Sequence, residues 1–578
     1  MPIDATEAAT LTDLLTRVAA RHADEPALIE RDGDRFTTLS FAQLNDAAGA
    51  LAEQLRSRGV RRSDVVGVWL PNWSEALVWE FALAALGAAA LGINTRYGVA
   101  ELTHLLERGR PVGLVVPAQF LELDFGGRLR SALNETGDAP TPWVAVVRGD
   151  AAAFDVGNGA WSPRGPHEAA APPDRPGGQS VEPGDTAAAG AGNMAAAGSA
   201  GNKAAAGAAG DPVNYFTTSG STGMPKLAGH DQASIATHCR HVAAAMDMRP
   251  GDCFLAALPL SGVFGFNPAM AMLSAGGACL LEPVFDAPVV LDDLETHGVT
   301  HVVGGDDMLG RLMDAWESAT AGERPALSRL RRGGIADFAG RAVAVAEWAQ
   351  RELGAIISGV YGSSELFSLT SIWPAQLELA EGSRPGGTVV ADEILVRAVD
   401  PESGRRCTPQ HTGELQFKGY NVVSGYLGDE AAARDAFTAD GWFRSGDLGF
   451  VLEQEGSFVY VCRAGDALRL RGFLVEPAEI ERFLTSHADV EAAKVVGVSA
   501  PSGADLAVAY VRLADGAGTS GDELLEFCRQ NLAPFKVPSF LNLVDEFPVT
   551  TGTNGTKIRT AELRRRAQKQ VAAESGDG

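Results

Sequence analysis

Short apolar runs alternate with helical patterns along most of this chain of 578 residues. The valine-rich run DVVGVWL (64–70) predicts a strand, and an amphipathic helix pattern follows it from about Ser74 to Leu91. Similar strand-like runs lie at 113–116, 143–147, 254–258 and 300–305. This alternation indicates an α/β fold, because helices that follow strands cover the faces of a sheet.

The net charge and the apolar segments limit the class of partner. The formal net charge is −25, which argues against nucleic acid or an anionic membrane as the main ligand. The longest apolar stretch, 81–93, is shorter than the roughly 20 residues of a membrane-spanning helix, so it predicts a buried helix. We therefore expect no nucleic-acid partner and no membrane span.

The cysteines and the N-terminal segment bear on the compartment. Six cysteines are scattered without a CxxC pair, which suggests neither a disulfide framework nor a metal site. The segment MPIDATEAATL (1–11) lacks the basic start and the apolar run of a signal peptide. Both observations favour a reducing compartment and predict a cytoplasmic protein.

Two changes in composition divide the chain. Residues 151–211 consist mainly of alanine, glycine and proline, which bury too little apolar surface to offset the entropy of ordering, so they predict a flexible insertion. We expect a large domain, 1–463, of stacked β-sheets with helices, and a small α+β domain, 464–578. Helices and strands of the small domain are expected at 477–486, 490–498, 506–513, 522–532 and 539–544.

The segment TTSGSTGMPK (217–226) follows the strand-like run VNYF (213–216) directly. Its glycines and hydroxyls, ending in a lysine, are typical of a phosphate-binding turn, because small residues let backbone amides approach an anion. It is not the common mononucleotide loop, which ends in Gly-Lys-Ser/Thr. Here Pro225 precedes the lysine and Leu227 follows it, so no hydroxyl remains to hold magnesium.

Five separated segments, in this order, resemble the adenylate-forming superfamily of acyl- and aryl-CoA synthetases, amino-acid adenylation domains and luciferases. They are TTSGSTGMPK (217–226), YGSSE (361–365), GELQFKGYNVVSGY (413–426), DGWFRSGDLG (440–449) and GDALRLRGFLVEPAEIE (465–481). The resemblance covers nearly the whole chain apart from the insertion. It implies that a carboxylate attacks the α-phosphate of ATP and that a thiol, usually coenzyme A, then displaces AMP.

The resemblance implies that the first segment wraps the β- and γ-phosphates of ATP. Its hydroxyls and amides would donate hydrogen bonds, and its lysine would add positive charge unless it is an ordinary solvent-facing lysine. The phosphate-binding residues are then Thr217, Thr218, Ser219, Gly220, Ser221, Thr222, Gly223 and Lys226.

In YGSSE, the resemblance implies that Tyr361 stacks on adenine and that Ser364 meets the α-phosphate, with Gly362 and Ser363 in the same nucleotide-binding turn. Glu365 would hold magnesium, which prefers oxygen ligands. The alternative for this carboxylate is that it complements the dipole at the start of a helix.

Three more positions are implied to bind the nucleotide. Asp447 would accept hydrogen bonds from the ribose hydroxyls, or else be an ordinary turn aspartate. Arg463 would contact ribose or phosphate, although Cys462 replaces the glycine that usually precedes it. Gly334, together with Gly333, falls where the family's adenine-side backbone lies.

Lys557 is the expected catalytic residue for adenylation, by resemblance to a late loop whose lysine bridges the carboxylate and the α-phosphate. The loop here, FPVTTGTNGTKIR (547–559), is longer than usual, and the alternative is a surface lysine. Gly465 stands at the usual hinge, and Gly472 stands where the pantetheine arm would pass. The resemblance therefore implies a mobile C-terminal domain that rotates between two half-reactions.

In the segment PLSGVFG (259–265), Ser261 and Gly262 replace a bulky pair found in many relatives, and Phe264 remains nearby. Small residues here either widen an acyl pocket or leave space that another side chain fills. The acidic pair at 306–307 either caps the next helix or binds a polar group of the substrate.

We therefore predict an ATP- and magnesium-dependent acyl-CoA synthetase that activates a largely apolar small-molecule carboxylic acid. Its expected cofactors are ATP, Mg²⁺ and coenzyme A. Two alternatives stay open. The acyl group passes to the pantetheine of an acyl carrier protein or stays as the adenylate, or the chain is a catalytically silent nucleotide-binding scaffold.

Overall fold

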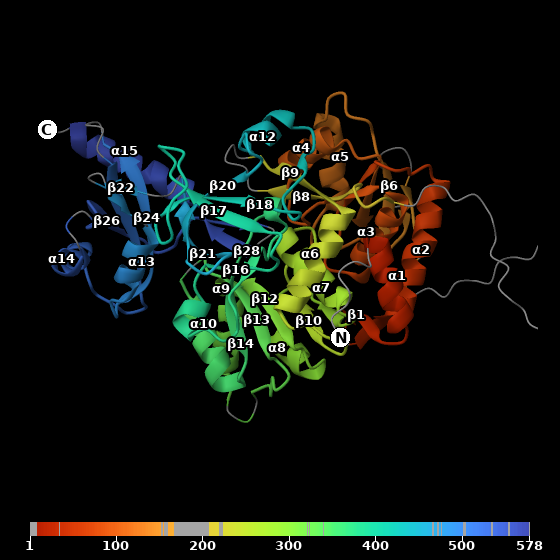
Figure 1. The fold of residues 1–578 in the computed structure, drawn as a ribbon, viewed down its shortest axis with the longest axis horizontal. Coiled ribbons are helices and arrows are strands. Elements are labelled where there is room, and N and C mark those ends of the chain that lie inside the picture. The colour runs from red at the N-terminus through yellow and green to blue at the C-terminus, as the bar shows by residue number, and fades with distance from the viewer. Residues whose placement is uncertain are drawn as a thin grey trace, which may run out of the picture.

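The computed structural model describes residues 9–33, 35–151, 154, 160–163, 165–166, 207–218, 224–320, 322, 324–338, 340–464, 468–470, 473–475, 477–500, 505–532, 534, 536–552 and 555–576. Figure 1 shows a large body built on two sheets, with a smaller blue domain at its C-terminal side. The predicted α/β class is confirmed by this architecture.

The first sheet has 13 described strands, which are in spatial order β17 (Leu395–Val399), β18 (Gly413–Lys418), β20 (Phe443–Val451), β21 (Ser457–Arg463), β16 (Gly386–Val389), β15 (Ser371–Ile372), β14 (Ile356–Tyr361), β13 (Arg332–Ala336), β12 (His301–Gly305), β10 (Cys253–Ala256), β11 (Ala278–Leu281), β1 (Pro26–Asp32) and β2 (Arg35–Ser40). The strands from β1 to β14 pair in parallel, and beyond β14 the pairing is antiparallel. The carboxyl ends of β12, β13 and β14 therefore share one edge, the edge at which open α/β sheets bind ligands.

The second sheet has eight described strands, which are β19 (Gly425–Tyr426), β9 (Lys226–Asp231), β8 (Pro212–Thr218), β4 (Ala89–Gly92), β3 (Val65–Val68), β5 (Gly113–Pro117), β6 (Trp143–Val147) and β7 (Ala160–Trp161). Strand β8 is parallel to β4 and antiparallel to β9. The predicted phosphate-binding segment therefore joins two strands of one hairpin, and its residues 219–223 lie outside the described residues.

The helices of the large body are α1 (Leu11–Arg21), α2 (Phe41–Ser57), α3 (Ser74–Leu86), α4 (Val99–Gly109), α5 (Phe125–Glu135), α6 (Gln232–Ala245), α7 (Val263–Ser274), α8 (Ala287–Thr296), α9 (Asp306–Ser318), α10 (Ala342–Trp348), α11 (Leu379–Gly382) and α12 (Glu430–Asp435). One core contains residues of both sheets together with α3, α6 and α7. Figure 1 shows α6 and α7, in yellow, between the two sheets. Every residue of α7 is buried, as this position requires.

The sequence prediction for the apolar stretch 81–93 is wrong in its second half. Helix α3 ends at Leu86, Gly87 adopts a left-handed φ of 68°, and the following residues form β4. Almost every residue of α3 is buried, so the predicted amphipathic pattern is also wrong. Glycine ends the helix because it reaches this conformation without a steric cost.

The predicted insertion, 151–211, is set too wide at both ends. Trp161 belongs to β7, which pairs with β6, and the Arg58 guanidinium lies 3.9 Å from its ring centroid. At the other end Asp211 is buried, and its Oδ1 accepts a hydrogen bond from Arg62 Nε at 2.9 Å. Trp161 and Asp211 differ from the alanine, glycine and proline around them, since each has a side chain that contacts the large body. Residues 167–206 lie outside the described residues.

Deleting residues 170–205 and closing the gap with a short linker is expected to leave the melting temperature within about 2 °C of the full chain. Loop length enters the closure entropy only logarithmically, at about 0.6 kcal/mol for each doubling. A deletion of 170–211 is the control, because it also removes Asp211 and its bond to Arg62 and should lower the melting temperature. An equal fall in both variants, measured by calorimetry, would contradict the prediction.

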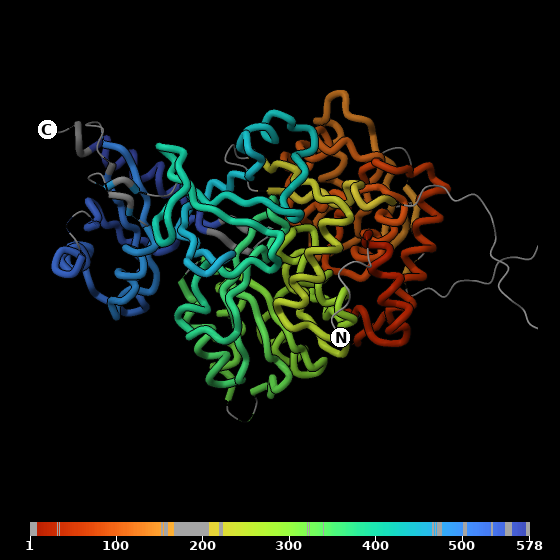
Figure 2. The backbone as a smooth tube through the Cα atoms, in the orientation of Figure 1, coloured from red at the N-terminus to blue at the C-terminus, as the bar shows by residue number. Residues whose placement is uncertain are grey.

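The C-terminal domain contains β22 (Leu468–Leu470), β23 (Phe473–Val475), α13 (Pro477–Thr485), β24 (Val490–Ser499), β25 (Asp505–Leu513), α14 (Gly521–Asn531), β26 (Phe540–Leu543), β27 (Val549–Gly552), β28 (Gly555–Ile558) and α15 (Thr560–Gly576). Strands β24, β25 and β26 form a sheet with an apolar core on each face. The β27–β28 hairpin leaves this domain and contacts α9 of the large body. Figure 2 shows this late, blue segment of the tube next to the green part of the chain, in agreement with the contact between β28 and α9.

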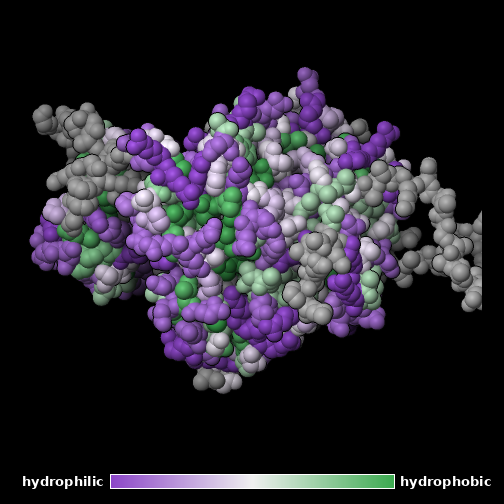
Figure 3. Space-filling model, viewed as in Figure 1, coloured by the Kyte–Doolittle hydropathy of each residue, from purple (hydrophilic) through white to green (hydrophobic). Residues whose placement is uncertain are grey.

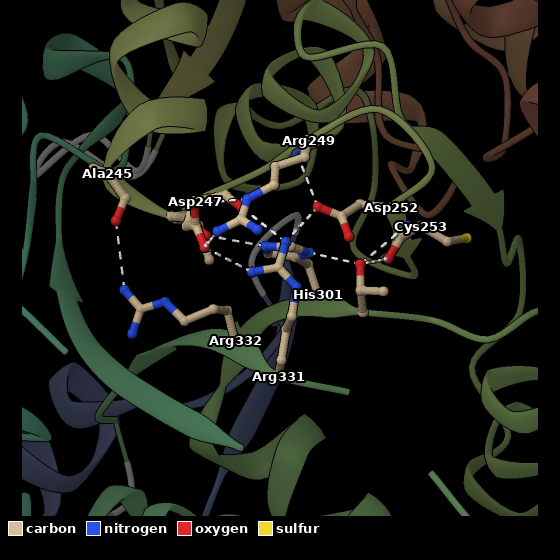
Figure 4. Close-up of polar contacts among 10 residues, drawn as sticks. Ala245, Asp247, Arg249, Asp252, Cys253, His301, Arg331 and Arg332 are labelled. Atoms are coloured by element: carbon tan, nitrogen blue, oxygen red, sulfur yellow. Dashed lines mark hydrogen bonds and ion pairs between the residues drawn. The ribbon is translucent and has the colours of Figure 1, made fainter. Parts of the chain in front are cut away.

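Charged side chains join the amino ends of β10, β12 and β13 to the end of α6 (Figure 4). Arg331 contacts both Asp247 and Asp252, and His301 Nε2 donates to the carbonyl of Met246 at 3.0 Å. Burial lowers the pKa of His301 to about 4, so its ring is neutral. This cluster connects sheet and helix at the edge opposite the carboxyl ends of the strands.

The face shown in Figure 3 is mainly hydrophilic, with small apolar areas between charged side chains. This distribution agrees with the apolar side chains that are buried in the cores of the body. Among the residues that the structure describes, no helix combines the length and the apolar character needed to cross a membrane.

Candidate active site

The predicted nucleotide-binding segments meet at the carboxyl ends of β8 and β14. A two-residue turn separates β14 from the short 3₁₀ helix η3 (Ser364–Leu366), and the Ser364 hydroxyl donates to the Thr217 carbonyl at 3.3 Å. The Thr217 hydroxyl in turn lies 2.9 Å from that of Tyr97. The fold thus brings the start of the predicted phosphate loop to the YGSSE turn, although nearly 150 residues separate them in the sequence.

A carboxylate, a guanidinium and a phenol form the centre of the predicted ribose site. Asp447 on β20 lies opposite Arg463 on β21, and Arg463 Nε is 3.1 Å from Asp447 Oδ1. The Tyr361 hydroxyl donates to Asp447 Oδ2 at 2.6 Å. Burial raises the pKa of the Asp447 carboxyl and Arg463 opposes this shift. One carboxylate oxygen thus binds Tyr361, and Oδ1 faces Arg463 without a hydrogen-bond partner among the described residues.

Tyr361, the residue predicted to stack on adenine, already stacks on another aromatic side chain. Its side chain is buried, and its ring stacks on Phe417 with centroids 5.5 Å apart. Burial, followed by the charge of Asp447, holds the pKa of Tyr361 well above its usual range, so the hydroxyl keeps its proton and donates. Stacking on adenine stays a prediction for the part of the ring that Phe417 does not cover.

Glu365 fits a magnesium ligand that shares the ion with phosphate. It is partly exposed, and its Oε1 accepts a hydrogen bond from the Tyr426 hydroxyl at 3.1 Å. The Lys226 ammonium lies 4.9 Å from the centroid of the Tyr426 ring. Among the described residues no group of three or more His, Cys, Asp or Glu side chains gathers around one point.

Tyr426 is a site residue that the sequence interpretation did not assign. Burial and the charge of Glu365 raise its pKa above the usual range, so it donates to the carboxylate across neutral pH. It connects the predicted metal ligand with Lys226 of the phosphate segment. The signal was present, because Tyr426 ends the motif segment 413–426.

The next predicted residues fall into four groups. Gly334 is buried in the middle of β13, where a Cβ atom would lie 3.0 Å from Val360, so packing already requires a small residue. Lys557 lies on β28, which contacts α9. Gly362 and Ser363 lie in the turn before η3, whereas the predicted residues outside the described part of the chain are Ser219, Gly220, Ser221, Thr222, Gly223, Gly465 and Gly472.

The predicted acyl-pocket segment precedes and begins α7. Gly262 is the N-cap residue of this helix, and Phe264 is buried. Further along α7, Phe266 packs with Phe216 and Phe367, with ring centroids 5.4 to 6.3 Å apart. Both sequence interpretations of Ser261 and Gly262 stay predictions.

The Asp306 carboxylate is held by backbone amides inside the protein and does not face a substrate group. Its side chain is fully buried, and its two oxygens accept hydrogen bonds from the backbone amides of Phe338 at 3.0 Å and Arg341 at 2.9 Å. It therefore caps the loop between β13 and α10 and leaves Gly305 as N-cap of its own helix. Asp337 lies beside it, and burial, reinforced by Asp306, raises the pKa of Asp337 to about 7.

Comparison with known proteins agrees with this geometry. The model of the AMP-binding enzyme family matches residues 15–427, and the model of the AMP-binding enzyme C-terminal domain matches residues 479–553. A feruloyl-CoA synthase of an Amycolatopsis species is 30% identical over 540 residues, which cover 92% of this chain and 94% of the relative. A 2-succinylbenzoate–CoA ligase of Bacillus licheniformis is 27% identical over 535 residues, which cover 91% and 94%.

Solved structures show the same fold. ATP-bound MatB from Rhodopseudomonas palustris superposes with a TM-score of 0.76 at 22% identity, over 97% of this chain and 99% of that chain. The resemblance to adenylate-forming enzymes, first drawn from five short segments, is confirmed by family models that match both domains. The chain belongs to the AMP-binding enzyme family.

Proposed function

We propose that this protein is an AMP-forming acyl-CoA ligase that joins a small carboxylic acid to coenzyme A through an acyl-adenylate. The proposal depends most on one observation. Thr217, Ser364, Glu365, Asp447 and Arg463 come from distant parts of the chain and meet at one edge of the sheets. Similarity to CoA ligases over more than nine-tenths of the chain supports the same reaction.

In this proposal the residues act mainly by holding charge in place. Asp447 and Arg463 bind the ribose of ATP, and the turn from β8 to β9 holds the phosphates against Ser364. Glu365 holds Mg²⁺, which neutralises phosphate charge when it is bound. Lys557 enters on β28 and adds positive charge between the carboxylate and the α-phosphate. Two anions must meet in this step, so neutralisation and positioning are what the protein has to supply.

The acyl group and the acceptor define the finer part of the proposal. The aromatic side chain Phe266 on α7 and its neighbours Phe216 and Phe367 favour an acid with an apolar chain or ring. Coenzyme A is the acceptor we propose, and the pantetheine of an acyl carrier protein is the alternative. A cytoplasmic location is also proposed, in agreement with six cysteines that form no disulfide.

The proposal is tested by release of pyrophosphate from ATP and Mg²⁺ in a panel of carboxylic acids. Ferulic acid and 2-succinylbenzoic acid are the first acids to test, because the relatives' names contain them. Product analysis with coenzyme A and, separately, with a phosphopantetheinyl carrier protein then identifies the acceptor. If no acid in a broad panel releases pyrophosphate from a folded, ATP-binding protein, the chain is a nucleotide-binding scaffold and the proposal is wrong.

Replacing Gly262 with tryptophan is expected to reduce kcat/KM for long or bulky acids at least 10-fold while short acids keep most of theirs. The N-cap of α7 lies in a packed interior that yields little to a larger side chain, and about 1.4 kcal/mol of steric cost corresponds to a factor of ten. The affinity for ATP should stay unchanged. An equal loss for short and long acids would show that Gly262 does not line the acyl site.

A further inference from the structure

Three consecutive residues directly after η3 have a left-handed backbone. The φ angles are 56° at Phe367, 54° at Ser368 and 39° at Leu369. Residues other than glycine rarely adopt this conformation, and three in succession persist only where the surroundings hold them in place. The segment begins two residues after Glu365, so its conformation sets the direction in which the chain leaves the predicted metal ligand.

Every backbone carbonyl from residue 364 to residue 368 accepts a hydrogen bond from another part of the chain. Four of the five donors are side chains and one is a backbone amide. The pairs are Ser364 with His230 Nε2 at 2.7 Å, Glu365 with the amide of Val423 at 2.7 Å, Leu366 with Asn421 Nδ2 at 2.9 Å, Phe367 with Asn267 Nδ2 at 2.7 Å and Ser368 with His238 Nε2 at 2.9 Å. Five donors from outside the segment therefore hold the backbone of residues 364–368 in place.

Asn267 is the donor that links this segment to the acyl side of the site. It lies on α7, the helix whose N-cap is Gly262, and its side chain is fully buried. Its Oδ1 has no hydrogen-bond partner among the described residues. A buried amide with an unsatisfied oxygen is destabilising, and an apolar residue of the same size would avoid this. The bond from Nδ2 to the Phe367 carbonyl is the interaction that an apolar residue cannot replace.

We propose that Asn267 is a positioning residue for Glu365. By donating to the Phe367 carbonyl it holds the left-handed segment, and the segment fixes the position from which the Glu365 carboxylate reaches the metal. The inference rests on the proposed function, in which Glu365 binds Mg²⁺ together with ATP. Some residues hold a metal ligand in position without contacting the metal themselves. Replacing such a residue typically weakens metal binding 10- to 100-fold.

The test measures binding of Mn²⁺, by electron paramagnetic resonance, in the presence of a non-hydrolysable ATP analogue. Asn267→Leu keeps the volume but removes the donor, and we expect the Mn²⁺ dissociation constant to rise at least 10-fold. Affinity for the analogue without metal should stay within about 2-fold, which separates a metal effect from general disruption. Unchanged Mn²⁺ affinity in folded Asn267→Leu would overturn the proposal.

A glycine rescue distinguishes positioning from packing. Ser368→Gly places in the segment a residue that adopts positive φ without support, so the single variant should bind Mn²⁺ like the natural chain. In the double variant Asn267→Leu/Ser368→Gly, most of the lost Mn²⁺ affinity should return. If the double variant folds but still binds Mn²⁺ weakly, or if it does not fold at all, Asn267 acts through packing and the proposal is wrong.

Glu365→Gln separates this inference from the proposed function. If Glu365→Gln weakens Mn²⁺ binding but Asn267→Leu does not, only the role of Asn267 is wrong. If Glu365→Gln binds Mn²⁺ as tightly as the natural chain, the assignment of Glu365 as metal ligand is itself wrong.

Discussion

Replacement of Lys557 with alanine is expected to lower acyl-adenylate formation by about 100-fold or more, while thioester formation from supplied acyl-adenylate stays within about 2-fold. The reason lies in the position of its strand. Hairpin β27–β28 extends from the small domain and contacts α9, so the strand that carries Lys557 reaches the large body, which contains the predicted nucleotide site. Its charge is needed where the carboxylate meets the α-phosphate and is not needed once that bond has formed.

Single-turnover assays of the two half-reactions measure this difference. Lys569→Ala, at an exposed position of α15, is the matched control and should leave both rates unchanged. A parallel loss of both half-reactions in Lys557→Ala would indicate that this lysine is structural, or that another lysine catalyses adenylation.

Replacement of Glu80 with glutamine is expected to stabilise the fold by a few kcal/mol at pH 8 and by little at pH 5. Glu80 lies on the buried helix α3, and its Oε2 accepts a hydrogen bond from Asn214 Nδ2 at 2.7 Å. Burial raises the pKa of its carboxyl to about 8. Each unit of pKa difference between the folded and unfolded states corresponds to about 1.4 kcal/mol.

The sign follows from proton binding. Between pH 4.5 and 8 the unfolded chain has lost the Glu80 proton and the folded chain retains it, so the free energy of unfolding falls as the pH rises through this range. Glutamine keeps a side-chain oxygen that accepts the hydrogen bond from Asn214, but it does not titrate. Urea unfolding at several pH values checks this, with Glu53→Gln at an exposed position of α2 as the control. A constant difference between Glu80→Gln and the natural chain at all pH values would refute the raised pKa.

The parallel strands could be predicted because burial on both faces gives them continuous apolar runs. This holds for β3, β5, β6 and β12, whose residues are almost all buried. The same property hid the end of α3, since a helix buried on all sides and the buried strand β4 have no difference in hydropathy. Gly87 was the one local signal at that boundary, and a single glycine is also compatible with a continuing helix.

The site was predictable where a residue type at a fixed spacing serves the ligand directly. Asp447 and Glu365 lie in motif segments of this kind, Arg463 lies between two of them, and the fold brings the three residues to one edge. Asn267 and Tyr426 were not found, because each acts through a residue about 60 to 100 positions away along the chain. Periodicity and motif spacing report local geometry, and neither encodes which distant carbonyl or carboxylate a side chain will meet.

The histidines that hold residues 364 and 368 have a consequence for the pH–rate profile. Burial lowers the pKa of His230 to about 4 and that of His238 to about 3, so both rings are neutral donors whenever the protein is folded near neutrality. Neither ring then changes its charge between pH 5 and 8. A bend in log kcat against pH in that interval would have to be assigned to substrate, nucleotide or another side chain, although both imidazoles contact the segment 364–368.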